Sequence, residues 1–167
     1  LGNVKIARDL VAAVTDLPFI FTLDDVFGTE PALEVQLPFL QMLLKDFAIV
    51  PFLIGHVAIT NVAILLERLW NDDETLIVIS SDLSHYLPYT QAKNTDAQAA
   101  KAILELNPSA LKSDMACGNI AIRGLLTGAA HKKLRATQID LRNSGDTAGS
   151  KDQVVGYGAF HFREIAT

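Results

Sequence analysis

The chain of 167 residues has a single cysteine, Cys117, so no disulfide bond can form within it. This excludes a disulfide framework, is typical of a reducing compartment, and predicts a cytoplasmic protein. Basic residues are also few, because 14 lysines and arginines stand against 19 aspartates and glutamates and give a formal net charge of −5. Since binding to nucleic-acid phosphates needs a basic face, we expect no nucleic-acid partner.

Long apolar runs are scarce too, apart from one stretch without charged residues between Phe47 and Leu66. Pro51, Gly55 and Asn61 interrupt it, so we interpret it as a strand followed by a helix and expect no membrane association. The N-terminus lacks the basic segment and apolar core of a secretory signal. The chain also lacks an initiator methionine, from which we expect a fragment or a processed form.

What the sequence does contain is a large apolar fraction, with 50% hydrophobic and 20% charged residues. A chain of this length suits a single domain over residues 1–167, able to bury roughly 70% of its unfolded surface. We see no internal repeat, low-complexity tract or interdomain linker.

Apolar periodicity and turn signals predict an alternation of helices and strands. Helices are expected over residues 4–14, 33–44, 58–70, 91–106 and 120–131, and strands over 48–54, 76–80, 136–141 and 154–162. The four branched aliphatics of Leu76–Ile79 are typical of a strand buried on both faces, and the β-α-β order implies parallel pairing. We therefore predict an α/β protein, a three-layer α/β/α sandwich with a mixed, mainly parallel central sheet.

The strongest candidate for a functional segment is Ser80–Tyr86, which follows that predicted strand directly. Ligands of open α/β sheets bind beyond the carboxyl ends of strands, so Asp82 and His85 are a candidate acid/base or metal-proximal pair. Two structural alternatives stay open. Asp82 can cap the next helix, and His85 can be a half-buried, hydrogen-bonded imidazole.

Two further segments are predicted to approach the same end of the sheet. Cys117 precedes Gly118 and a predicted helix, where a thiol is a better nucleophile or metal ligand, although a lone cysteine is more often a small core residue. Ser144 and Asp146 lie in a dense turn signal, for which an ordinary tight turn is the common explanation.

Five sequence blocks together carry a resemblance to a known family. They are residues 34–40, 80–86, 117–118, 143–146 and 154–158. Their order and spacing, within residues 30–162, resemble the Memo family, also known as the AmmeMemoRadiSam system protein B family. The resemblance implies a fold shared with class III extradiol dioxygenases, whose non-haem iron lies at one end of a central sheet.

The resemblance also implies roles for individual residues. Cys117 corresponds to the family's metal-binding cysteine, and Asp82 and His85 correspond to its Asp/His pair, with His85 in the place of a general acid/base. Ser81, Ser144 and Asp146 are expected to line the pocket. A thiolate together with imidazole ligands suits iron or copper.

This chain departs from the family pattern in two places. The family's two histidine ligands precede the matched region, so the resemblance implies a chain that lacks the family's N-terminal portion and those ligands. In addition, Pro31 stands where the family usually has a histidine.

Three functions follow from the resemblance as hypotheses. The first is a metal-dependent oxidoreductase related to extradiol dioxygenases. The second is a non-catalytic binding or adaptor module that holds a peptide or small molecule in the same pocket, as expected from animal members associated with signalling. The third is an accessory protein to a radical-SAM partner.

Overall fold

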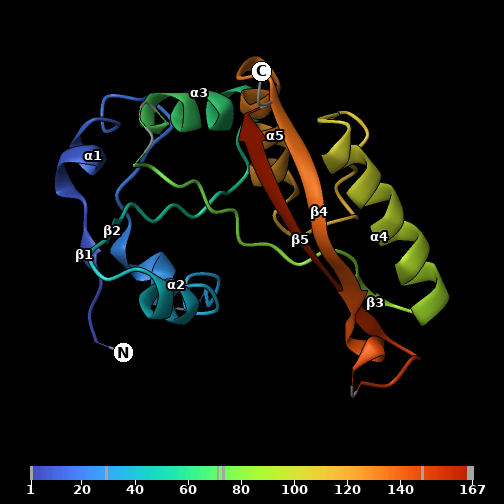
Figure 1. The fold of residues 1–167 in the computed structure, drawn as a ribbon. Helices are drawn as coiled ribbons and strands as arrows, with labels where there is room; N and C mark the ends of the chain where they lie inside the picture. The colour runs from blue at the N-terminus through green and yellow to red at the C-terminus, as the bar shows by residue number, and fades with distance from the viewer. Residues whose placement is uncertain (1, 29, 71, 73, 148, 165–167) are drawn as a thin grey trace.

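The structure is a computed structural model that describes residues 2–28, 30–70, 72, 74–147 and 149–164. It is a mixed α/β protein in which small elements of the N-terminal part lie to one side and a longer helix–strand assembly lies to the other (Figure 1). The mixed α/β character predicted from the sequence is confirmed.

The N-terminal part is built from short elements. They are β1 (Lys5–Ile6), α1 (Arg8–Ala12), the 3₁₀ helix η1 (Asp24–Gly28), α2 (Leu37–Leu43) and β2 (Ala48–Ile49). Strands β1 and β2 form a parallel pair, and neither α1 nor α2 has a buried residue. Proline in its first turn marks the start of α2, because proline at that position costs no helical hydrogen bond.

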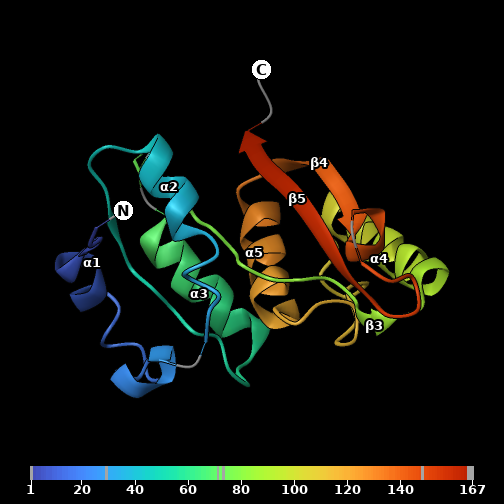
Figure 2. The same ribbon diagram turned by 90° about the horizontal axis from the view of Figure 1, so that it is seen from below.

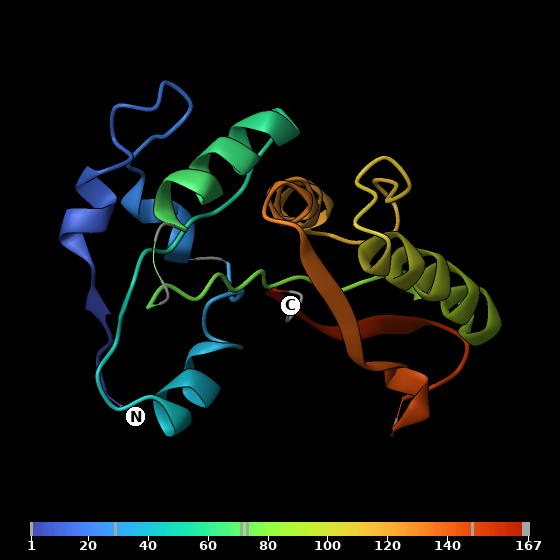
Figure 3. The same cartoon turned by 45° about the horizontal axis from the view of Figure 1, so that its top comes forward.

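The C-terminal part contains the longer elements. They are β3 (His85–Leu87), α4 (Tyr89–Leu104), α5 (Asn119–His131), β4 (Leu134–Asn143), the 3₁₀ turn η2 (Ser144–Asp146) and β5 (Val154–Glu164). The strands form an antiparallel sheet in the order β3-β5-β4. Helices α4 and α5 pack against it (Figure 3). Their shared core includes Leu83, Leu111 and Leu126, each no more than 3% exposed.

Helix α3 (Ile59–Leu69) joins the two parts, because it lies beside α5 (Figure 2). Val62 and Leu66 of α3 pack with Leu125 of α5, while a separate cluster joins Leu65 and Leu69 of α3 to Val14 and Leu17. None of the helices in the described ranges has the length and apolar character needed to cross a membrane.

The predicted elements differ in how well they match the structure. Helices over 58–70, 91–106 and 120–131 and strands over 136–141 and 154–162 are confirmed, with ends shifted by up to two residues. The helix predicted over 4–14 divides into β1 and α1, that over 33–44 is limited to α2, and only two residues of the strand over 48–54 pair.

The interior strand predicted over Leu76–Ile79 was wrong. This segment is not paired with a strand in the described residues; Leu76 and Val78 are 69% and 46% exposed, while Ile77 and Ile79 pack on the α3–α5 cluster. An apolar run makes a buried strand only where another strand hydrogen-bonds to it. In the described residues β3 pairs with β5 at Val154 and Val155, β4 pairs with it from Gly156 to Glu164, and neither ladder includes residues 76–79.

The three-layer sandwich with a mainly parallel central sheet is therefore corrected as well. The larger sheet is antiparallel, and the parallel pairing is confined to β1 and β2 in the described part of the chain. The physical reason is the same, because residues 76–79 form no strand and, among the described residues, no parallel ladder extends from the N-terminal part into the C-terminal sheet.

Candidate functional site

The segment Ser80–Ser84 is held between β5 and the start of α5 by backbone hydrogen bonds. Leu83 N–H donates to the carbonyl of Gly156 at 2.9 Å, and Gly156 N–H donates to the carbonyl of Ser84 at 2.8 Å. On the other side, Cys117 N–H donates to the carbonyl of Asp82 at 3.3 Å. These bonds fix the position of residues 80–84 relative to β5 and α5, although these residues belong to none of the β-strands.

These bonds bring Cys117 into contact with the predicted segment. The Asp82 N–H lies 3.3 Å from Cys117 Sγ and donates to it, and Ser81 Oγ lies 3.5 Å from the same sulfur. Ser81 Oγ also accepts a hydrogen bond from Gly118 N–H at 2.9 Å. The Cys117 side chain remains exposed, so its sulfur is accessible to a metal ion or an electrophile.

Asp82 connects this sulfur to an imidazole. Its Oδ2 lies 3.5 Å from His85 Nε2, and both side chains are partly exposed. His85 begins β3 and pairs with Val155, but the register is irregular after it, where Tyr86 has a φ of 56°. A left-handed conformation is unusual for an aromatic residue, although Leu106 and Lys133, outside this segment, also adopt it. Asp82 thus contacts Cys117 through its backbone and His85 through its carboxylate.

Ser144 and Asp146 make different contacts. Ser144 Oγ accepts a hydrogen bond at 3.2 Å from the N–H of Val155, the β5 residue that pairs with His85. Asp146 accepts from Asn143 N–H at 2.9 Å in a capping arrangement and from Tyr89 Oη at 2.5 Å.

The bond to Tyr89 lowers the pKa of the Asp146 carboxyl, with the Asn143 N–H adding to the effect, and it raises the pKa of the Tyr89 phenol. Asp146 is thus engaged with α4 rather than with Cys117.

Sequence reasoning missed two side chains that contact this segment. Gln36 Nε2 donates to Ser80 Oγ at 3.2 Å and links the N-terminal part to the site. Asp96 of α4 is buried and accepts a hydrogen bond from Ser84 N–H at 3.0 Å. Gln36 belongs to a block that carried the resemblance, whereas no local signal distinguishes Asp96 from the polar residues around it.

The described residues do not form a complete metal site. In the part of the chain that the structure describes, no group of three or more histidine, cysteine, aspartate or glutamate side chains is arranged to hold an ion. Cys117 Sγ meets the backbone of Asp82, while the Asp82 carboxylate faces His85. One thiol and one Asp/His pair are present, but a closed coordination sphere is not.

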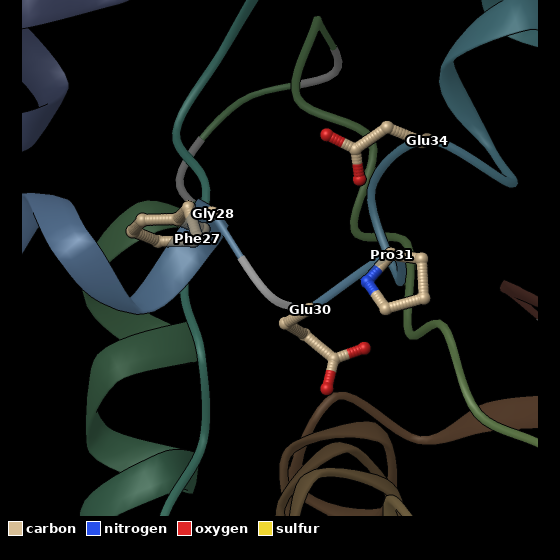
Figure 4. Close-up of a pocket in the computed structure, with 5 residues that line it drawn as sticks. All are labelled: Phe27, Gly28, Glu30, Pro31 and Glu34. Carbon is tan, nitrogen blue, oxygen red and sulfur yellow. The ribbon is translucent and has the colours of Figure 1, made fainter.

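A hollow of about 380 Å³ lies elsewhere, around Pro31 (Figure 4). Its lining residues are Phe27, Gly28, Glu30, Pro31 and Glu34. It contains two carboxylates but none of the predicted site residues. The proline at position 31 provides no imidazole there.

Comparison with known proteins identifies the class of this protein. A family model described as Memo-like protein matches residues 1–161. The chain therefore belongs to the Memo-like family, as its sequence blocks predicted.

The relatives are MEMO1 family proteins of archaea and bacteria. Identity is 34% to one from Aeropyrum pernix, covering 95% of this chain and 61% of the relative. It is 36% to one from Methanosarcina mazei (95% and 64%) and 34% to one from Archaeoglobus fulgidus (98% and 66%). The chain thus spans less than two thirds of the length of the curated relatives it matches.

Proposed function

We propose that this chain carries the thiolate side of a non-haem metal pocket in a metal-dependent oxidoreductase related to extradiol dioxygenases. The observation behind the proposal is the continuous contact from Cys117 Sγ through Asp82 to His85. Cys117 is the proposed ligand, and iron or copper is the ion that suits a thiolate beside imidazole.

In this proposal Asp82 and His85 handle protons rather than coordinate the ion. Asp82 Oδ2 lies 3.5 Å from His85 Nε2, so in this proposal the carboxylate orients the imidazole that takes up or gives the proton. Ser81 keeps its hydroxyl beside the sulfur through the bond from Gly118 N–H. The residues of this chain would then position the thiolate and move a proton next to it.

A second candidate is a non-catalytic module that holds a small molecule or peptide at the same place. It is favoured by the incomplete ligand set among the described residues. An accessory role beside a radical-SAM partner stays a prediction, because no contact in the structure bears on it.

The two candidates differ in metal affinity. The chain, reduced and anaerobic, would be titrated with Fe²⁺ and separately with Cu⁺, alongside Cys117→Ser and His85→Ala. We expect weak binding by the wild type because the ligands are few, and a larger loss in Cys117→Ser than in His85→Ala because only the thiolate donates to the ion.

His131→Ala is the matched control, since His131 is an exposed imidazole on α5 paired with Glu67. It should bind metal as the wild type does. Equal affinity of the wild type and Cys117→Ser would exclude Cys117 as a ligand and make the binding module the leading function.

A further inference from the structure

Asp96 is a buried carboxylate on the inner face of α4, next to the candidate site. Its side chain is only 2% exposed, and the other buried residues of this helix are alanines and one isoleucine. Moving a carboxylate out of water costs free energy unless hydrogen bonds compensate for it. A charged residue at such a position therefore calls for a specific partner.

That partner is the backbone of the site segment. Ser84 N–H donates to Asp96 Oδ1 at 3.0 Å, and this bond is buried. Ser84 directly precedes His85, and it lies two residues after Asp82. Asp96 thus attaches to the chain between the two members of the Asp/His pair.

The same segment is attached to β5 at one residue. Gly156 N–H donates to Ser84 O at 2.8 Å, and Leu83 N–H donates to Gly156 O at 2.9 Å. The segment is therefore fixed from two directions, by a side chain of α4 and by the backbone of β5.

Asp96 and Gly156 also fit each other closely. A Cβ atom built on Gly156 would lie 2.2 Å from Asp96 Oδ2 and 2.5 Å from Asp96 Cγ. The carboxylate fills the space that a side chain at position 156 would take. Only glycine at 156 allows Asp96 to reach the Ser84 amide without displacement.

We propose that Asp96 is a positioning residue for this site. Through Ser84 it holds residues 82–85 so that Asp82 meets Cys117 on one side and His85 on the other. The consequence for metal binding rests on the proposed function, whereas the placement of the segment can be tested without any metal.

The test compares Asp96→Ala, which removes the acceptor, with Asp96→Asn, which keeps an oxygen that can accept. Glu105→Ala is the control, because it deletes an exposed carboxylate at the end of the same helix. Amide hydrogen exchange would be measured residue by residue. In Asp96→Ala we expect protection to fall about tenfold or more at the Ser84 and Cys117 amides, with the β4–β5 ladder unchanged.

Asp96→Asn should restore most of that protection, and Glu105→Ala should resemble the wild type. Gly156→Ala approaches the same contact from the other side, and we expect it to lower protection at the same two amides. It also keeps the proposal testable where Asp96→Ala does not fold. A uniform loss of protection over the whole ladder, or no loss at Ser84 and Cys117, would overturn the positioning role.

Metal titration of the same variants separates the two proposals. If the wild type binds Fe²⁺ or Cu⁺, Asp96→Ala should lose affinity in the same direction as Cys117→Ser, and Asp96→Asn should lose less. If the wild type binds neither ion, the proposed function fails, but the exchange pattern still decides whether Asp96 positions the segment.

Discussion

The N-terminal part before α3 and the C-terminal part after it use apolar residues in different ways. In α2, Phe39, Met42 and Leu43 are 69%, 76% and 81% exposed, and the helix has no buried residue. The less apolar helix α4 buries six residues, mostly alanines. Burial in this protein therefore follows from what packs against a segment and not from how hydrophobic that segment is.

The largest expected difference between the two parts concerns core truncation. Leu126→Ala should lower the free energy of unfolding by about 2–5 kcal/mol, because Leu126 of α5 is fully buried in the C-terminal core and its removal leaves a cavity. Leu43→Ala in α2 is the matched control and should change it by less than about 0.5 kcal/mol. Urea unfolding followed by Trp70 fluorescence measures both, and equal losses would contradict the comparison.

A smaller effect is expected where α3 joins the two parts. A Cβ atom at Gly124 would lie 2.4 Å from Val62 Cγ1 of α3, whereas nothing lies within 4 Å of one at Gly128. Gly124→Ala should therefore destabilise the protein by about 1–3 kcal/mol through overpacking. Gly128→Ala on the same helix should stabilise it by up to about 1 kcal/mol, since alanine favours a helix more than glycine does. A Gly124→Ala variant as stable as the wild type would show that α3 and α5 do not pack this closely.

The smallest expected effects on stability involve one exposed carboxylate in each part of the protein, Asp16 in the N-terminal part and Asp146 in the C-terminal part. The hydrogen bond and the charge of Arg68 lower the pKa of Asp16, and the hydrogen bond from Tyr89 lowers that of Asp146. A carboxyl with a lowered folded-state pKa adds stability above its unfolded value of 3.8, and this contribution is lost as the pH falls through the folded pKa.

Tyr89→Phe and Arg68→Gln should therefore each be slightly less stable than the wild type near neutral pH. Their differences from the wild type should shrink at acidic pH, although Arg68→Gln still lacks the bond that Arg68 donates to the carbonyl of Ala13. High salt should shrink the difference for Arg68→Gln more than for Tyr89→Phe, because salt screens an ion pair but not a neutral phenol donor. Thermal unfolding across pH and salt measures both. A difference that stays the same size from neutral to acidic pH would rule out the carboxylate as its source.

The local sequence pattern was sufficient to predict the helices and strands that have a clear apolar periodicity of their own. The apolar periodicity predicted α3, α4 and α5, and alternation predicted β4 and β5, because these patterns depend on residues near in sequence. The run Leu76–Ile79 has an equally strong signal yet pairs with no strand in the described residues. A strand depends on hydrogen-bonding neighbours, and these are set by the tertiary arrangement.

For the candidate site, the sequence by itself determined which residue types are available: one thiol at Cys117, an Asp/His pair at 82 and 85, and the blocks of a Memo-like protein. Only the tertiary structure decided that Asp82 lies against Cys117, that Asp146 faces Tyr89, and that Asp96 is buried beneath Ser84. Each of these contacts joins segments distant along the chain. Such contacts form only when helices and strands pack, and composition and spacing do not specify how they pack.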